Sequence, residues 1–225
     1  MRKIVAALSM GLILTGATVY ASPAAEFERG AVVLEVGGAF NSKVKGQGYM
    51  NLDADGDSGY KYSVTAGLSD KFALQYKHGD FKSVYKTVTV PSLGSLTTYA
   101  EAEPTDIQLL YKINPNLVLT TGYEHTKISY GRFVESATRS AFHIGLTGTH
   151  KIDDKTTLFA TILTGKDVDF KEAGVSYKLS PRSAFTVSYA ERKVKDMDLK
   201  IARVPQTSKV DYTMTGITCM FATRI

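Results

Sequence analysis

The most restrictive feature of this sequence is an alternation of polar and apolar residues from Thr105 to His125, interrupted once at Asn114-Pro115-Asn116. A period of two places successive side chains on opposite faces of a β-strand, and Asn and Pro provide the backbone geometry of a tight reversal. The stretch therefore predicts a β-hairpin with one aliphatic and aromatic face. Its other face carries Asp106, Gln108, Lys112 and Glu124. A polar face of this kind does not suit the packed interior of a soluble sandwich, but it is typical of a barrel with lipid outside and a polar lumen inside.

The same pattern recurs along the rest of the chain and predicts about ten strands. Tight turns are expected at 69–71, 114–116, 153–155 and 180–182, longer connections at 41–57, 83–98, 130–137 and 196–208, and a short connection near 166–168. Alternating short turns and longer loops are typical of outer-membrane barrels, in which an even strand number leaves both chain ends on the periplasmic side. We therefore predict an all-β fold, a single antiparallel up-and-down transmembrane β-barrel of about ten strands, with eight as the alternative count. A soluble lipocalin-like barrel would give no reason for ionisable residues to recur on the inner face.

One predicted strand, at 157–165, cannot be oriented from its pattern. Leu158 and Ile162 compete with Phe159 and Leu163 for the outward face. Because both sets are apolar, the alternation does not decide which of them faces the lumen.

The first residues have the pattern of an export signal. Arg2 and Lys3 precede an apolar run over 4–18, and small residues follow up to Ala21. We expect cleavage after Ala21, which divides the chain into a signal peptide at 1–21 and an outer-membrane β-barrel domain at 22–225. A membrane-spanning helix is the competing interpretation, but the run is shorter than the roughly 20 apolar residues that a span requires. Because Arg2 and Lys3 are the only charged residues of 1–21, cleavage lowers the formal charge from +5 to +3, which is too small to indicate nucleic-acid binding.

The signal peptide, the repeated amphipathic hairpins, the turn at Asn114-Pro115-Asn116 and a terminal strand resemble the small single-domain outer-membrane barrels of Gram-negative bacteria. This broad group includes porin-like and OmpA-transmembrane-like proteins. The resemblance implies localisation in the cell outer membrane, with outer-membrane lipids and the outer-membrane assembly machinery as partners; lipopolysaccharide as a further partner depends on the basic residues of the last long loop. Such barrels usually end in an aromatic residue that the machinery reads, whereas this chain ends in Ile225, with Phe221 on the same face.

The expected inner face carries acidic and basic residues together. The lumen receives Glu35, Asp106, Glu124 and Glu172 with Lys61, Lys77, Lys112, Lys178 and Arg192. Charges in a confined space of low dielectric constant are costly unless they are paired, so we expect an ion-pair network across the barrel. An eight-stranded barrel is filled by its own side chains, and about ten strands leave only slightly more room. The sequence therefore predicts a structural or narrow-pore role and favours it over a general porin.

An enzyme is the alternative from a different class. Barrel proteases of the omptin type carry an Asp-x-His element, whereas His78-Gly79-Asp80 has the reverse order. Barrel lipid deacylases use a His with a Ser two residues later, but the first serine after His125 is Ser129. A nucleophile and its base must lie within hydrogen-bonding distance, so we expect no catalytic residues, no cofactor and no enzymatic activity. The alternative functions are a barrel enzyme acting on lipid A or peptides at the cell surface, and an adhesin-like surface-binding barrel.

Two expected loops carry clustered charges. Asp53, Asp55 and Asp57 alternate as oxygen ligands do in calcium loops. Glycine is missing at the sixth position of that motif and Val64 stands where its bidentate Glu belongs, so a solvated acidic loop is favoured over a calcium site. The last long loop and its flanks carry Arg192, Lys193, Lys195, Lys200 and Arg203. This basic segment would either bind lipopolysaccharide phosphates or simply keep the loop solvated, and the sequence does not decide between the two.

Overall fold

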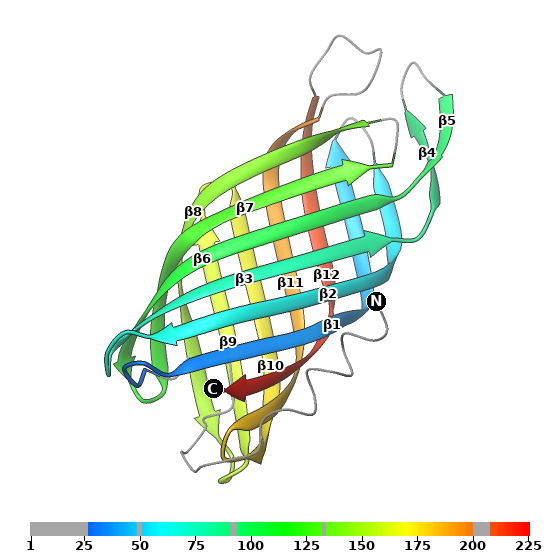
Figure 1. Ribbon diagram of the computed structural model, residues 1–225. Helices are drawn as coiled ribbons and strands as arrows, with labels where there is room; N and C mark the ends of the chain where they lie inside the picture. Colours follow the sequence, from blue (N-terminus) through cyan, green and yellow to red (C-terminus); the bar gives the residue numbers. More distant parts are fainter. Residues whose placement is uncertain (1–26, 49–50, 91–93, 132–133, 200–207) are drawn as a thin grey trace.

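A computed structural model describes residues 27–48, 51–90, 94–131, 134–199 and 208–225 of the 225-residue chain (Figure 1). The signal peptide expected at 1–21 lies outside these residues and stays a prediction. Within the described ranges every regular element is a β-strand, and no helix there is long and apolar enough to span a membrane.

Ten of the described strands close into one barrel, in which each strand pairs antiparallel with its neighbours. Their bounds are β1 Val32–Gly48, β2 Leu52–Gly67, β3 Phe72–Ser83, β6 Ala100–Asn114, β7 Leu117–Tyr130, β8 Val134–Lys151, β9 Thr156–Gly165, β10 Val168–Ser180, β11 Ser183–Leu199 and β12 Ser208–Arg224. β4 (Lys86–Val90) and β5 (Gly94–Thr98) form a separate hairpin between β3 and β6 that projects from the top of the barrel in Figure 1. The predicted all-β, antiparallel up-and-down barrel of about ten strands is confirmed.

Several strands run further than the sequence indicated. The loop expected at 41–57 is wrong, because β1 continues to Gly48 and β2 begins at Leu52. Asp, Gly and Ser are frequent in this segment and are typical of turns. However, Val44, Leu52 and Ala54 alternate into the barrel and are buried there. Pairing with neighbouring strands and burial of these side chains therefore outweigh the local turn preference.

The tight turns and the longer connections lie at opposite ends of the barrel. The expected tight turns at 69–71, 114–116, 153–155 and 180–182 each join consecutive strands at one end, which we call the short-turn end. At the opposite loop end, the expected connection at 83–98 contains the β4–β5 hairpin, and most of 130–137 belongs to β7 and β8. Of the connection expected at 196–208, residues 200–207 lie outside the described part of the chain.

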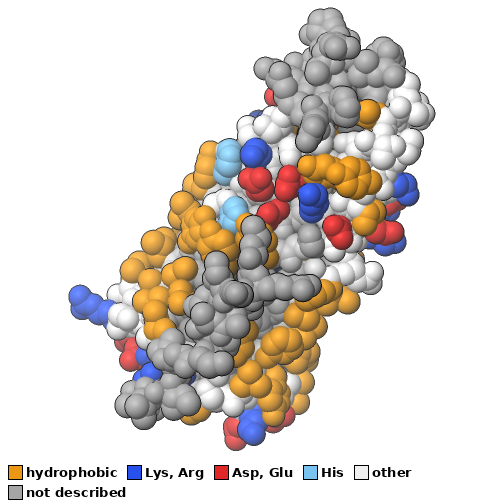
Figure 2. All heavy atoms as spheres, turned by 45° about the vertical axis from the view of Figure 1, so that its right-hand side comes forward, with side chains coloured by type: hydrophobic (Ala, Val, Ile, Leu, Met, Phe, Trp, Pro, Cys, Tyr) orange, Lys and Arg blue, Asp and Glu red, His pale blue; other side chains and the backbone are white. Residues whose placement is uncertain are grey.

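The outward side chains change character at one level of the barrel. Toward the short-turn end they are large and apolar, as at Val36, Val64, Leu74, Leu109, Phe142, Ile162, Val175, Val187 and Ile217. Toward the loop end the outward positions carry charges, among them Lys45, Asp53, Glu103, Lys127 and Lys193. On the face shown in Figure 2, hydrophobic side chains gather on both sides of the lower part, and a group of charged side chains lies above them. We call these two parts the membrane half and the outer half, since an apolar outward band is the lipid-facing surface of such barrels.

The interior is arranged in the opposite way. In the outer half an apolar cluster fills it, here called the outer layer, which includes Leu52, Ile128, Tyr130, Leu199 and Tyr212. In the membrane half many inward residues are polar or charged, namely Ser63, Gln75, Asp106, Gln108, Thr120, Glu124, His143, Thr161, Ser176 and Thr186. At the short-turn end a lower layer follows, in which Phe27 packs against Ala73, Leu110 and Val118. The polar segment of the lumen therefore lies between two apolar layers.

The orientation of β9, which the sequence left open, follows from its register with β8. Thr161 lies directly opposite Thr147, and their hydroxyl oxygens are 2.9 Å apart inside the barrel. Opposed residues of an antiparallel pair share one face, so Phe159 and Leu163 also face inward and are buried. Leu158 and Ile162 belong to the outward apolar band.

Candidate functional site

The charged part of the lumen begins with two carboxylates on neighbouring strands. Asp106 on β6 and Glu124 on β7 are directly opposite each other in the antiparallel register. Both side chains point inward and are buried, as the alternation in the 105–125 hairpin predicts. Like charges placed directly opposite each other destabilise a sheet, so this pair requires a cation.

Arg192 supplies that cation from across the lumen. It belongs to β11, which β8, β9 and β10 separate from β7 around the ring. Its Nη2 lies 2.9 Å from Asp106 Oδ2, and its Nη1 forms an ion pair with Glu124 Oε2. The guanidinium also lies 4.9 Å from the centre of the Phe170 ring. Charge-assisted contacts in a buried environment are among the stronger polar interactions, so Arg192 connects opposite walls of the barrel.

A second set of charged side chains surrounds a small cavity beside Arg192. Glu35, Lys61, Lys77 and Glu172, together with Asp106 and Arg192, line a space of about 100 Å³. Glu35 accepts a hydrogen bond from Ser63, and Glu172 Oε1 accepts one from Ser188 at 2.6 Å. Lys61 and Lys77 lie close enough to Glu172 to interact with it electrostatically. A space of this size holds several water molecules.

Of the nine residues that the sequence placed in the lumen, Lys112 and Lys178 lie apart from these two sets. Lys112 Nζ is 5.2 Å from the centre of the Phe27 ring, in the lower layer. Lys178 lies opposite Ala184, near the turn that joins β10 to β11. Lys112 is six positions further along β6 than Asp106, which corresponds to about 20 Å. Alternation gives the face of a strand on which a residue lies, but it does not give the height at which two strands meet.

His143 and Gln108 were not singled out in the sequence, yet they adjoin the two carboxylates. His143 on β8 is 2% exposed, and its Nε2 lies 3.2 Å from Gln108 Nε2. The residue opposite His143 is Gly122, where a Cβ would come within 2.4 Å of the Ile107 carbonyl oxygen. A side chain at Gly122 would therefore collide with β6 at Ile107 and Gln108, and glycine avoids this collision. The alternation in the sequence indicates only that His143 lies on the inward face of its strand. Its neighbours depend on the register of β7 and β8, which the sequence does not give.

The acidic segment at 53–57 lies on a strand, so the acidic loop expected there is wrong. Asp53, Asp55 and Asp57 all point outward from β2 and are exposed. Successive outward residues of a strand are roughly 6.7 Å apart, so these carboxylates spread along the surface and do not converge on one calcium ion. Asp53 instead forms an ion pair with Lys45, with a separation of 3.6 Å.

The basic segment is divided between the lumen and the outer surface. Arg192 points inward, whereas Lys193 Nζ lies 3.8 Å from Asp211 and Lys195 Nζ lies 2.6 Å from Asp169. Lys200 and Arg203 lie outside the described residues. Binding of lipopolysaccharide phosphates by this segment stays a prediction.

No protein-family model matches the sequence, and no curated protein matches it. The outer membrane protease OmpT from Escherichia coli matches the structure with a TM-score of 0.61 and 12% identity, over 92% of this chain and 99% of its own. Outer membrane protein OprG from Pseudomonas aeruginosa has a TM-score of 0.45 and 11% identity, over 88% of this chain and 97% of its own. Neisserial surface protein A has a TM-score of 0.41 and 10% identity, over 87% and 99%. At such identities the likeness to OmpT concerns the fold alone, which is that of a barrel in the outer membrane.

Proposed function

Because the chain is a small β-barrel of the Gram-negative outer membrane, we propose that it is a structural barrel with a closed lumen and no enzymatic activity. The observation that carries this proposal is the position of the charged side chains between two apolar layers. An open diffusion pore requires a continuous polar path through the barrel. Here the outer layer fills the lumen above the charges, and Phe27 packs inside the short-turn end below them.

The ion pairs of the lumen support a structural role. Arg192 binds one carboxylate on β6 and one on β7, so it ties the wall formed by these strands to β11. Removing one member of a buried ion pair leaves an uncompensated charge in a poorly solvated place. The network therefore favours the closed ring of strands over partly opened alternatives.

A narrow pore is the second candidate, and the charges around the cavity favour it. Glu35, Lys61, Lys77 and Glu172 line the 100 Å³ space, so ions that reach it would meet fixed charges of both signs. For such a pore to conduct, both apolar layers must open. The two candidates therefore predict different currents from the unmodified protein.

The enclosure of the carboxylates also weighs against an enzyme. Asp106 and Glu124 are buried, and among the described residues the outer layer lies between them and a peptide at the cell surface. Lipid A would lie outside the wall and would meet the apolar band instead. An adhesin-like role draws some support from the β4–β5 hairpin, which projects from the barrel (Figure 1). The charged outward side chains of the outer half support it as well. We expect the purified barrel to cleave neither peptides nor lipid A.

The test is the conductance of the refolded protein in a planar bilayer. The two layers act in series, so we expect no steady current from the unmodified protein, from Phe27→Ala, or from Tyr130→Ala/Tyr212→Ala. The Tyr130 and Tyr212 rings contact each other edge-on, 5.7 Å between centres, within the outer layer. The combined triple variant should conduct.

Phe72→Ala is the matched control for Phe27→Ala. Phe72 is an aromatic residue near the same end of the barrel, but it is 41% exposed on the outer face. Adding Phe72→Ala to the tyrosine pair should leave the barrel closed. A steady current from the unmodified protein would overturn the closed-barrel proposal in favour of the narrow pore.

A further inference from the structure

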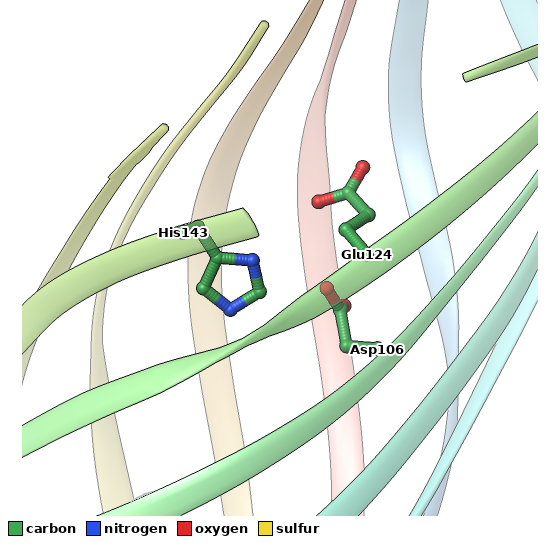
Figure 3. A group of neighbouring side chains, drawn as sticks. All are labelled: Asp106, Glu124 and His143. Atoms are coloured by element: carbon green, nitrogen blue, oxygen red, sulfur yellow. The ribbon is translucent and has the colours of Figure 1, made fainter. Parts of the chain in front are cut away.

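Three buried side chains on consecutive strands of the membrane half converge on one point. They are Asp106 of β6, Glu124 of β7 and His143 of β8, and one oxygen or nitrogen atom of each lies within 4.8 Å of the others. Figure 3 shows the imidazole ring and the two carboxylates directed toward a common space. Their exposed fractions are 2%, 3% and 2%. The closed-barrel proposal assigns a role to the carboxylates as partners of Arg192, but it gives none to the histidine.

Two atoms of this group have no hydrogen-bond partner among the described residues. They are Asp106 Oδ1 and His143 Nδ1. Buried polar atoms are nearly always satisfied, and each exception calls for an explanation. An ionised carboxylate oxygen and a neutral imidazole nitrogen both carry a lone pair suited to a cation. The unpartnered atoms therefore indicate a ligand that the protein side chains do not supply.

The contacts of Arg192 leave these lone pairs available. Arg192 binds Asp106 through Oδ2 and Glu124 through Oε2. Asp106 Oδ1 stays unpartnered, and Glu124 Oε1 accepts one hydrogen bond, from Thr126 at 2.6 Å. Since each carboxylate oxygen has two lone pairs, Oε1 can bind a cation while it holds the Thr126 hydroxyl. Arg192 thus contacts each carboxylate through one oxygen and leaves the other oxygen, Asp106 Oδ1 or Glu124 Oε1, able to bind a cation.

The charge balance around Arg192 leaves room for one more positive group. Four inward carboxylates, those of Glu35, Asp106, Glu124 and Glu172, are accompanied by three inward bases, Lys61, Lys77 and Arg192. Lys43 also borders the cavity but is exposed, so the inward acids exceed the inward bases by one. Arg192 alone cannot neutralise both carboxylates that it contacts. Either a proton on His143 or a bound cation beside it would supply the missing charge.

We propose that Asp106, Glu124 and His143 bind one divalent transition-metal ion, for which Zn²⁺ is the appropriate probe. One imidazole nitrogen with two carboxylate oxygens is a ligand set that Zn²⁺ accepts, at about 2.0–2.2 Å from each atom. Tetrahedral ligand atoms at that distance are about 3.4 Å apart, so small side-chain rotations would close the site. The fixed charge of Arg192 repels the ion and keeps the affinity moderate.

Gln108 is positioned to support this coordination. With the metal on Nδ1, the proton of His143 stays on Nε2, which faces the Gln108 carboxamide at 3.2 Å. The carboxamide would then turn its oxygen toward Nε2 and accept that hydrogen bond. Partners of this kind fix the tautomer of metal-binding histidines.

The experiment measures Zn²⁺ binding to the metal-stripped full barrel, refolded in detergent micelles, by calorimetric titration. We expect one equivalent of Zn²⁺ per chain. His143→Gln should weaken binding at least tenfold, whereas the control His125→Gln should bind like the unmodified protein. His125 lies on the adjacent strand β7 but faces outward, where its Nδ1 contacts Ser140. Mobility on unheated gels reports whether each variant is folded.

A second measurement does not depend on any variant. X-ray absorption at the zinc edge of the loaded, unmodified protein should show one imidazole and a shell of oxygen atoms, with no sulfur. Three results would overturn the proposal: no binding, equal binding by His143→Gln, or a spectrum without imidazole. If Zn²⁺ does not bind, a proton shared between His143 and Asp106 is the better account of the two unpartnered atoms.

Discussion

The two ends of strand β11 differ in which side of the barrel wall is apolar. In the membrane half Val187 is 41% exposed on the outer face, and Ser188 is 3% exposed in the lumen. In the outer half Lys193 lies outside and pairs with Asp211, whereas Val194 is 1% exposed inside. Even-numbered residues face inward at both places, so the strand geometry is the same and only the chemistry of the two faces is exchanged.

This exchange shows that each half is adapted to a different solvent. Water surrounds the outer half, so burying apolar side chains inside it is favourable and the hydrophobic effect stabilises the outer layer. Lipid surrounds the membrane half, where placing apolar residues inside would gain little. Its interior therefore depends on hydrogen bonds and ion pairs, which must be satisfied because water is scarce there. The two halves should respond differently to the same substitution.

The largest expected effect is the loss of Arg192. Arg192→Met should destabilise the refolded barrel by about 3–5 kcal/mol, because it leaves two buried carboxylates without their cation. Adding Glu124→Gln should recover part of this loss, so the double variant should cost less than the sum of the single changes. Urea unfolding in lipid vesicles measures all three.

Lys193→Met is the control, because Lys193 is the next residue on β11 but lies in the exposed pair with Asp211. Exposed ion pairs contribute about 0–1 kcal/mol. Similar losses for Arg192→Met and Lys193→Met would show that the lumen charges are solvated, and the contrast between inside and outside would disappear.

A smaller effect is expected when an arginine is placed on the outer face of each half. Leu109→Arg should destabilise the inserted barrel by about 2–4 kcal/mol, because Leu109 lies in the apolar band. Thr213→Arg should have little effect, since Thr213 lies opposite Lys45 and Lys193 among the charged outward residues. Equal losses at the two positions would mean that the boundary between the halves is misplaced.

Except at β9, the face of a strand on which a side chain lies could be predicted from the sequence, but the extent of the strands could not. Period-two alternation correctly oriented the hairpin around Asn114-Pro115-Asn116 because its two faces differ in polarity. The prediction of a loop at 41–57 was wrong because Gly, Ser and Asp give this segment a turn-like composition. In the structure its residues belong to β1 and β2, which pair with each other, with β12 and with β3. In the outer half, moreover, the inward side chains are the apolar ones. The expectation of a polar lumen therefore does not identify strands in this part of the barrel.

The candidate site was only partly predictable for a related reason. Asp106, Glu124 and Arg192 could each be placed inside the barrel from their parity. That Arg192 meets Asp106, 86 residues away in sequence, depends on how the ring closes and at what height each strand stands. The place of His143 beside these carboxylates depends on the register of β7 against β8, in which it is opposite Gly122. Neither the relative height of strands across the ring nor the register of neighbouring strands can be derived from a local sequence pattern.

The smallest effect is expected at Asp153, a carboxylate in the turn between β8 and β9, exposed to water. Its Oδ1 accepts hydrogen bonds from the backbone N–H groups of Lys155 and Thr156, each at 2.7 Å. These bonds favour the ionised form and lower the pKa of Asp153 below its usual value of 3.8. The buried carboxylates of the lumen depend instead on Arg192, so this turn shows how a carboxylate behaves when water and backbone amides are its partners.

A carboxyl group whose pKa is lower in the folded state stabilises the fold above its unfolded pKa, and this stabilisation is lost as pH falls through the folded pKa. We therefore expect the unmodified barrel to exceed Asp153→Asn in stability by a small, constant amount above about pH 4, near the unfolded value. Below that pH the difference should shrink toward zero, because Asn keeps the acceptor oxygen but does not titrate. Unfolding in vesicles between pH 6 and pH 2.5 measures the difference. A difference that stays constant over the whole range would mean that the Asp153 charge does not stabilise the turn, and that only its geometry does.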